Sequence, residues 1–374
     1  MKTLCYVATI PAVVHAFLRP HIQAAAEKYR VTVICNEADK HLLEGLKAQL
    51  ILLPIERKPS FVKDVTLLIK LIFLFKKQRF DIVHSIMPKT GLIAMLAAKL
   101  TQIPTRIHTF TGQVWATKIG LKRVLLRSVD KLIGWLATSV LTDSPSQRDF
   151  LINEGVLSSL KVKVIGAGSI CGVDPLRFHA DMPSRQFIRH NLEIPAEAKV
   201  ILFVGRLNRD KGMLDLAAAF NALARQHSEL ILLLVGAEEE ITFSQIQQLC
   251  QSVQTRLRYV SFTATPEYYM AAADIFCLPS YREGFGLTII EAAACGVPAV
   301  ASNIYGITDA VEDGMTGLLF PAGDIRGLTR ALTKLIIDNE LRINMGQSAC
   351  ARALDQFSCA KITSEMVGLY DNLS

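Results

Sequence analysis

Two kinds of pattern are scarce in this chain of 374 residues, and each absence excludes a class of protein. Its eight cysteines are scattered, without a CxxC pair or the His/Cys spacing of a zinc site, which argues against a disulfide framework and against a metal site. Its charge-free apolar runs are too short to span a bilayer, although 51% of the residues are hydrophobic. We therefore expect a cytoplasmic protein with reduced thiols and without a membrane-spanning helix.

The N-terminal segment superficially resembles a secretion signal, because a lysine precedes the apolar stretch in MKTLCYVATIPAVVHAF. No small-residue cleavage site follows that stretch. We therefore expect Leu4 to Thr9 to form the first buried strand of a folded domain rather than part of a signal peptide.

Short apolar runs alternate with helix-length amphipathic stretches along almost the whole chain. This alternation is typical of parallel β-sheets that are covered by helices on both faces. The polar, irregular stretch from Gly166 to about Ala198 interrupts the pattern and is the expected connection between two domains. We predict an α/β protein with one domain over residues 1–168, a second over 169–356, and a last helix over 357–374 that packs back on the first.

Charge is divided unevenly between the two halves of the chain. Residues 1–160 contain 22 Lys and Arg against 11 Asp and Glu, whereas residues 161–374 contain 19 against 23. A basic half is expected to face an anionic partner, and nucleic acid would satisfy the same bias. Because no recognition-helix, zinc or RNA-binding signature accompanies it, we favour an anionic membrane surface or a lipid diphosphate over nucleic acid.

Two stretches of the basic half are amphipathic, namely residues 61–80 and residues 113–137, the second with both tryptophans of the chain. An apolar face edged by lysine and arginine is what a helix needs to lie in the headgroup region of a membrane. Such a helix can also simply cover a sheet. Covering a sheet is the favoured interpretation for residues 61–80, and for residues 113–137 both interpretations stay open.

Two glutamates separated by seven residues mark the most informative motif, SYREGFGLTIIEAAACG. Glu283 lies in a glycine-rich loop after the apolar run from Ile275 to Leu278, and Glu291 lies inside the helix that this loop opens. Glycines let bare backbone N–H groups approach a phosphate at a helix N-terminus, whereas carboxylates accept hydrogen bonds from hydroxyls. The apolar neighbours of Glu291 argue against an idle, solvated carboxylate. The motif indicates a diphosphate ligand with hydroxyl-rich groups at both ends.

A basic turn precedes this motif, because Arg206 and Lys211 flank the turn in GRLNRDKG after the apolar run from Val200 to Val204. In an open parallel sheet, the loops after neighbouring strands face one crevice. Arg206 and Lys211 could then hold the diphosphate by forked and point-charge contacts. An exposed turn would explain the two residues if they stood alone, and the Glu283 loop makes binding the stronger interpretation.

The C-terminal half resembles the nucleotide-sugar half of the family-4 retaining glycosyltransferases in three motifs: GRLNRDKG, ADIFCLPSYREGFGLTIIEAAACGVPAVAS and VEDGMTGLLFPAGD. That family has the GT-B architecture, in which two Rossmann-like, doubly wound parallel-sheet domains face each other across a cleft. In the N-terminal half, DIVHSIMPKTG and RIHTFTGQVW resemble the bacterial members that build surface polysaccharides on lipid carriers. The resemblance runs almost end to end.

The resemblance implies a retaining, metal-independent hexosyl- or N-acetylhexosaminyl-transferase that needs no cofactor. Its donor would be a nucleoside-diphospho-sugar, with UDP favoured and GDP open. Its acceptor would be a saccharide on polyprenyl diphosphate, for O-antigen, capsule or exopolysaccharide synthesis at the inner face of the cytoplasmic membrane. No DxD triplet occurs in the chain, which removes the usual cation-binding motif of metal-dependent sugar transferases.

The same resemblance assigns roles to the four charged residues. Arg206 and Lys211 bind the donor diphosphate, Glu283 binds hydroxyls of the transferred sugar, and Glu291 binds the nucleotide ribose. The backbone of the loop completes the expected donor site at Gly284, Phe285, Gly286 and Leu287. The family's front-face attack, in which the leaving diphosphate draws the acceptor's proton, gives Glu283 a positioning role instead of that of a nucleophile.

Catalytic candidates in the N-terminal half are less well marked. Many relatives carry a histidine just before the glycine of the fifth-strand motif, where this chain has Thr111. His108 and His84 are substitute candidates on predicted strands, although a lone strand histidine is more often structural. The residues expected on the acceptor side are Pro11, His15, Lys89 and Thr111.

Two other functions stay open from the sequence alone. A sugar-nucleotide epimerase or hydrolase on the same architecture would turn over the donor without any acceptor. A non-catalytic member would only bind partners or membrane, and the presence of all four charged residues argues against such decay.

Overall fold

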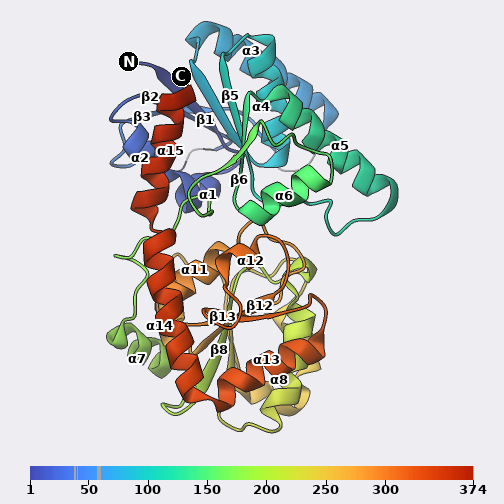
Figure 1. Cartoon of the computed structure of the whole chain (residues 1–374), viewed down its shortest axis with the longest axis vertical. Helices are drawn as coiled ribbons and strands as arrows, with labels where there is room; N and C mark the ends of the chain where they lie inside the picture. The colour runs from blue at the N-terminus through green and yellow to red at the C-terminus, as the bar shows by residue number, and fades with distance from the viewer. Residues whose placement is uncertain (38, 40, 57–59, 374) are drawn as a thin grey trace. The chain divides into compact units, whose positions relative to one another are not determined.

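The chain forms two compact units in the computed structural model, which describes residues 1–37, 39, 41–56 and 60–373 (Figure 1). Unit 1 comprises Met1–Gly172 together with Cys359–Ser374, and unit 2 comprises Val173–Ser358. The boundaries expected from the sequence were residues 168 and 356. Each unit has its own sheet and its own core.

Unit 1 is built around seven parallel strands in the spatial order β3-β2-β1-β4-β5-β6-β7. Chain order reverses between β1 and β4, which is the place where an open α/β sheet leaves a crevice at its carboxyl edge. The strands are β1 (Thr3–Val7), β2 (Arg30–Cys35), β3 (Ala48–Leu52), β4 (Ile82–Ile86), β5 (Thr105–Phe110), β6 (Ser139–Thr142) and β7 (Val162–Val164). Every residue of β4 and β6 is buried, as expected for strands that are covered on both faces.

Three long helices of unit 1 lie side by side in Figure 1: α3 (Phe61–Gln78), α4 (Pro88–Leu100) and α5 (Gly120–Leu136). α4 packs against both α3 and α5, and also against β4 and β5. Buried side chains of all three helices join one hydrophobic core with the sheet. The remaining helices of the first segment are α1 (Pro11–Val13), the π-helix η1 (Val14–Leu18), α2 (Arg19–Ala25) and α6 (Pro145–Asn153).

The last helix, α15 (Cys359–Leu373), belongs to unit 1 and packs against α2. Its Tyr370 hydroxyl lies 2.9 Å from the Tyr6 hydroxyl on β1 and 2.7 Å from Nδ1 of His84 on β4. All three side chains are buried. Because buried polar groups are costly without partners, these hydrogen bonds help to fix α15 on the sheet.

Unit 2 is built around six parallel strands in the order β10-β9-β8-β11-β12-β13, with the reversal between β8 and β11. The strands are β8 (Lys199–Val204), β9 (Leu230–Val235), β10 (Leu257–Val260), β11 (Ile275–Leu278), β12 (Ala299–Ser302) and β13 (Gly317–Phe320). Its helices are α7 (Met182–Asn191), α8 (Met213–Ala224), α9 (Phe243–Leu249), α10 (Pro266–Ala272), α11 (Leu287–Ala294), α12 (Ile307–Ala310), α13 (Ile325–Ile337) and α14 (Asn339–Gln356), with 3₁₀ turns η2 (Arg209–Lys211) and η3 (Gln251–Arg256).

The stretch from 166 to 198 was expected to be irregular, and it contains the helix α7. Arg185 and Arg189 of α7 each bind Asp274, with N···O distances of 2.7 Å. Asp274 lies just before β11, and its Oδ2 also accepts the N–H of Val200 at 2.7 Å. Polar residues of the stretch that suggested a loop therefore anchor a helix at the amino end of β11, a central strand of the second sheet.

No helix in the described part of the chain combines the length and apolarity needed to cross a membrane.

Candidate active site

Two loops of unit 2 meet at the carboxyl edge of its sheet, where β8 and β11 are neighbours. The N–H of Tyr281 donates to the carbonyl of Asp210 at 2.8 Å. A Cβ atom on Gly212 would lie only 2.0 Å from the carbonyl oxygen of Pro279, and Gly212 has a φ of 69°. Both the contact and the left-handed conformation therefore require glycine at this position. The turn after β8 and the loop after β11 are thus in direct contact.

Lys211 and Glu283 form an ion pair across this contact, in which Lys211 Nζ donates to Glu283 Oε1. Ser280 Oγ donates to the same oxygen at 2.8 Å. The two charged side chains are 22% and 13% exposed, so the pair is partly desolvated and still reachable from solvent. Sequence reasoning did not single out Ser280, which stands three residues before Glu283 in the same loop.

Arg206 binds a residue that the sequence did not point to, Glu239. Arg206 Nη1 lies 2.6 Å and 2.7 Å from the two carboxylate oxygens of Glu239, and Asn208 Nδ2 donates to Glu239 Oε2 at 2.8 Å. Glu239 lies in the loop after β9, which is held to the β8 turn because its N–H donates to the carbonyl of Leu207 at 3.2 Å. Three consecutive glutamates, 238–240, begin three residues after the end of β9 and mark this loop as acidic, although their spacing does not link Glu239 to Arg206.

The helix α11 opens directly from the Glu283 loop. Gly286 is its N-cap residue in a left-handed conformation with a φ of 85°, and no side chain among the described residues caps this end. Phe285 is buried against Phe357, with ring centroids 5.1 Å apart, which holds the loop against the core. The first turn of α11 therefore presents backbone N–H groups and the positive end of the helix dipole, which suits an anion.

Glu291 lies one turn into α11 and is half-buried. Burial raises its pKa to about 7, while the charge of Arg177 lowers it and that of Glu267 raises it further. Arg177 Nη2 and Glu267 Oε2 form their own ion pair at 2.8 Å. The structure therefore brings Lys211 and Glu283 into contact and puts Arg206 on the same turn as Lys211, whereas Glu291 has Arg177 and Glu267 as its charged neighbours.

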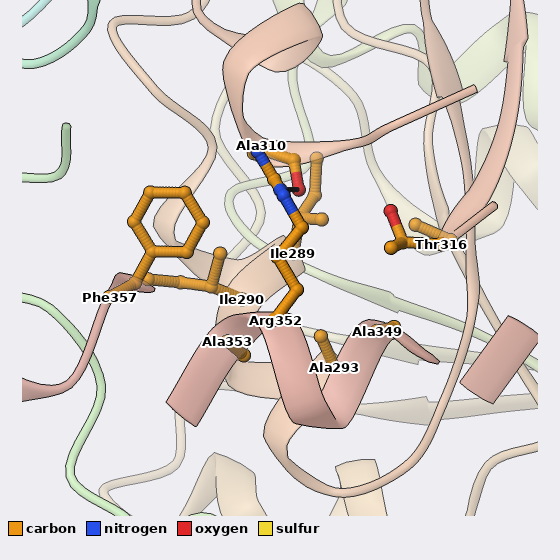
Figure 2. Close-up of a pocket in the computed structure, with 10 residues that line it drawn as sticks. Ile289, Ile290, Ala293, Ala310, Thr316, Ala349, Arg352, Ala353 and Phe357 are labelled. Atoms are coloured by element: carbon orange, nitrogen blue, oxygen red, sulfur yellow. Dashed lines mark hydrogen bonds between the residues drawn. The ribbon is translucent and has the colours of Figure 1, made fainter. Parts of the chain in front are cut away.

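A small cavity beside α11 has an apolar lining apart from Thr316 and Arg352 (Figure 2). The cavity belongs to the core that supports the Glu283 loop. In Figure 2 the Arg352 side chain rises from α14 toward Ala310. Arg352 donates to the carbonyls of Ala310 at 2.9 Å and Asp309 at 2.7 Å, and its guanidinium lies 4.9 Å from the ring centroid of Phe357. Arg352 thus ties the end of α12 to the aromatic pair that supports the Glu283 loop.

The two candidate histidines of unit 1 are buried in its core. His84 Nε2 lies 2.7 Å from the Thr109 hydroxyl, in addition to its contact with Tyr370. The ring of His108 lies against α4, since a Cβ on Gly91 would be 2.3 Å from its Cε1 atom. Desolvation lowers the pKa of each histidine to about 3, so both are neutral at physiological pH.

The expected acceptor-side residues are spread over several elements of unit 1. Pro11 is buried at the start of α1, and Thr111 is half-buried just after β5. His15 Nε2 lies 2.8 Å from Asp39 Oδ2 at the surface. Lys89 Nζ lies 2.7 Å from Asp64 Oδ1.

One buried carboxyl at the carboxyl edge of the unit 1 sheet was missed. Asp143 directly follows β6, and burial raises its pKa to about 8. Its Oδ1 atom has no hydrogen-bond partner among the described residues. Gln147 Oε1 accepts the N–H of Asp143 at 2.7 Å. The position of Asp143 at the end of an apolar run was the available signal.

No group of three or more His, Cys, Asp or Glu side chains suited to a metal ion occurs within residues 1–37, 39, 41–56 and 60–373. All eight cysteines are free thiols, most of them buried.

Two family models match the chain, one in each half. Residues 22–168 match the glycosyl transferase 4-like domain, and residues 184–352 match the glycosyl transferases group 1 family. The chain is 31% identical over 320 residues to the capsular polysaccharide biosynthesis glycosyltransferase CapM of Staphylococcus aureus, covering 85% of this chain and 84% of that protein. It is 26% identical over 351 residues to the UDP-Gal:alpha-D-GlcNAc-diphosphoundecaprenol alpha-1,3-galactosyltransferase of Escherichia coli, covering 92% and 89%.

Solved structures confirm the predicted architecture. HepE of Anabaena, crystallised with UDP and glucose, matches with a TM-score of 0.83 at 20% identity over all of both chains. The two parallel-sheet α/β units, of seven and six strands, support the GT-B fold. By its sequence relatives and its fold, the chain belongs to the family-4 glycosyltransferases.

Proposed function

We propose that this glycosyltransferase moves a sugar from a nucleoside-diphospho-sugar, with a UDP-sugar favoured, to a lipid-linked saccharide. The acceptor would be a saccharide on polyprenyl diphosphate at the inner face of the cytoplasmic membrane, and the product would enter a surface polysaccharide. The transfer proceeds with retention of anomeric configuration and without a metal ion.

The contact between Lys211 and Glu283 is the single observation that carries this proposal. It puts a cation for the diphosphate and a carboxylate for sugar hydroxyls side by side at the reversal point of the unit 2 sheet. The relatives support the substrate classes. CapM serves capsular polysaccharide biosynthesis, and the galactosyltransferase of Escherichia coli is named for UDP-Gal and a diphosphoundecaprenol acceptor.

The chemical step breaks the bond between the anomeric carbon and the donor diphosphate. Charge that develops on the leaving diphosphate is stabilised by Lys211, by Arg206 and by the N–H groups at the start of α11. The backbones of the two loops are fixed before the donor arrives, since the N–H of Tyr281 donates to the carbonyl of Asp210, and only the Lys211 and Arg206 side chains have to change partners. Such preorganisation is what lowers the barrier for a departing anion.

The two glutamates position the ends of the donor. Glu283 accepts hydrogen bonds from hydroxyls of the transferred sugar once Lys211 turns to the diphosphate, and Ser280 keeps its carboxylate in place. Glu291 accepts from the ribose. The acceptor hydroxyl attacks from the side of the leaving group, and its proton passes to the departing diphosphate oxygen, so no protein base is needed. We assign no proton transfer to His84 or His108.

The experiment is a transfer assay with the purified full chain, a panel of UDP- and GDP-sugars and synthetic polyprenyl-diphospho-saccharides. The expected result is a glycosylated lipid with the anomeric configuration of the donor, read by mass spectrometry and NMR. Release of UDP or of an epimerised donor without any lipid product would instead indicate a hydrolase or an epimerase. Donor binding without turnover on any acceptor would indicate a non-catalytic member.

Metal independence is tested in the same assay. We measure the initial rate with saturating donor and acceptor and with about 5 mM EDTA, roughly a hundredfold excess over adventitious metal. We expect this rate to equal the rate without EDTA. A rate that collapses with EDTA and returns with added Mg²⁺ or Mn²⁺ would contradict this part of the proposal.

A further inference from the structure

The residue directly before Glu283 forms a second ion pair between the two loops of the candidate donor site. Arg282 Nη2 lies 3.0 Å from Asp210 Oδ2, and the two side chains are 20% and 29% exposed. Asp210 directly precedes Lys211 in the chain, just as Arg282 precedes Glu283. Two successive residues of the turn after β8 are therefore paired with two successive residues of the loop after β11.

The order of charges in the two loops specifies how the loops are aligned. The turn carries an anion and then a cation, at Asp210 and Lys211, whereas the loop carries a cation and then an anion, at Arg282 and Glu283. A shift by one residue would place either Lys211 opposite Arg282 or Asp210 opposite Glu283, and like charges in contact repel each other. The observed alignment pairs both cations with anions. The backbone bond from the N–H of Tyr281 to the carbonyl of Asp210, at 2.8 Å, supports the same alignment.

Asp210 and Lys211 are tied together because both belong to one short 3₁₀ turn, η2. The side chain of Asn208 caps this turn, and its Oδ1 atom accepts the N–H of Lys211 at 3.0 Å. A displacement of Asp210 therefore also displaces the backbone of Lys211. Through this turn, the partner of the Asp210 carboxylate influences where the Lys211 ammonium lies.

The guanidinium of Arg282 is not fully satisfied by its ion pair. Its Nε atom is buried and has no hydrogen-bond partner among the residues that the structure describes. A buried donor without a partner lowers stability, and an apolar side chain of similar volume would avoid that cost. Local rules of this kind are broken mainly at functional sites. A role in stability alone therefore does not account for Arg282.

We propose that Arg282 is a positioning residue for the donor. Through Asp210 it holds Lys211 beside Glu283, in the alignment that binds the donor diphosphate. This inference rests on the proposed function, because it takes a nucleoside diphosphate as the ligand of Lys211. It goes beyond that function by assigning the alignment of the two loops to an ion pair that stays closed when the donor binds.

A double-mutant cycle on UDP affinity tests the proposal with the full chain. Arg282→Met removes the cation and Asp210→Asn removes the anion, and each should raise the Kd for UDP in calorimetry by about tenfold. The double variant should show the same loss of about tenfold, because both substitutions break one pair. A loss of about a hundredfold in the double variant would mean that the two residues act independently, which would overturn the proposal.

Two further variants separate positioning from a general effect on the fold. Arg282→Lys keeps a positive charge within reach of Asp210 and should bind UDP within about threefold of the wild type. Arg209→Met removes an exposed cation from the same turn, and this matched control should bind UDP as the wild type does. A lower unfolding temperature of Arg282→Met at unchanged UDP affinity would make Arg282 a structural residue and contradict the inference.

The transfer assay adds a kinetic readout that a merely structural role would not give. In Arg282→Met, kcat/KM for the donor should fall by about tenfold while the KM for the lipid-linked acceptor stays unchanged, since the pair acts on the donor site. Binding of neither UDP nor GDP by the wild type would contradict the proposed donor class, and this inference with it. Equal UDP binding by the wild type and Arg282→Met would contradict the role of Arg282 alone and leave the proposed function standing.

Discussion

The two units place very different side chains at the carboxyl edges of similar sheets. In unit 2 the edge carries charged groups in exchangeable ion pairs, such as Lys211 with Glu283 and Arg206 with Glu239. In unit 1, His84 lies within β4 and His108 within β5, and both side chains are buried and neutral. A shared topology therefore does not imply a shared role, because the ion pairs of unit 2 lie within reach of solvent, whereas His84 and His108 of unit 1 do not.

The difference assigns separate tasks to the two halves. Ion pairs that are partly solvated exchange partners at little cost, so unit 2 can release its cations to an anionic ligand. Buried histidines resist protonation because the imidazolium charge would have no water around it, so we expect His84 and His108 to stabilise unit 1 and not to bind its ligands. We therefore expect the donor to be bound and cleaved in unit 2, and the acceptor to be bound by unit 1.

The largest expected effect comes from breaking the charged pair of unit 2. Glu283→Gln or Lys211→Met should lower kcat by about 10²–10³-fold, as loss of one preorganised electrostatic contact typically does. The measurement is steady-state transfer, with circular dichroism to show that the fold is intact. Glu340→Gln and Lys334→Met, at exposed positions of unit 2, serve as matched controls. Turnover above about a tenth of the wild-type rate in either site variant would contradict the assigned site.

Substitution of the buried His84 in unit 1 is expected to lower stability and to leave turnover almost unchanged. His84→Leu removes partners from the Tyr370 and Thr109 hydroxyls and should lower the free energy of unfolding by about 2–4 kcal/mol, with kcat of the folded enzyme changed less than about twofold. Urea titrations followed by tryptophan fluorescence measure the first quantity. A hundredfold loss of kcat at unchanged stability would show that His84 takes part in the reaction.

The pH dependence of the free energy of unfolding gives a second test of the role of His84. The folded-state pKa of His84 lies near 3, below its usual value of 6.5, so the unfolded state binds the proton more readily. The stability contributed by neutral His84 is fully present above pH 6.5 and is lost as the pH falls toward 3. His84→Leu should therefore lose less stability than the wild type between pH 7 and pH 5.

A smaller effect is expected for Glu291, whose pKa near 7 makes its charge sensitive to physiological pH. The carboxylate accepts hydrogen bonds from a ribose, and the protonated form accepts less well. Because the ionised fraction rises from about a tenth at pH 6 to about nine tenths at pH 8, the KM for the donor should fall by up to about tenfold over this range. Glu291→Gln should flatten this dependence, and a profile that stays steep in the variant would assign it to another group.

The smallest predicted effect concerns Glu239. It occupies the guanidinium of Arg206 in the absence of ligand, and an exposed pair of this kind is worth about 0.2–1 kcal/mol. Glu239→Gln should therefore tighten UDP binding by about two- to fivefold, as measured by calorimetry. Glu240→Gln, in the same loop, is the matched control. Weaker UDP binding by Glu239→Gln would instead make Glu239 a positioning residue for Arg206.

The sequence predicted strands well where every residue of the strand is apolar. β11 was expected over the apolar run from Ile275 to Leu278 and has these bounds, because a strand buried on both faces must be a continuous apolar run. The same logic predicted that the loops after β8 and β11 meet. Periodicity and strand neighbours were sufficient for these inferences.

Contacts between distant loops could not be predicted in the same way. The partners of Arg206 and Glu291 come from other loops and helices, and no spacing rule connects Glu239 or Glu267 to them. His108 shows a second limit, since alternation on a strand that is buried on both faces does not tell which face a side chain takes. Its environment depends on Gly91 of α4, whose missing side chain makes room for the ring. The side chains around the predicted motif thus required the structure.

The hydroxyl of Tyr370 has a consequence for biosynthesis. Tyr6 and His84 are translated early, but the helix that satisfies them leaves the ribosome only after all of residues 173–358. The second unit can therefore reach its native state before the first has its full set of hydrogen bonds. A nascent chain that stalls before Tyr370 is expected to leave the Tyr6 hydroxyl and the His84 ring without these hydrogen bonds, so α15 is a late contribution to the stability of unit 1.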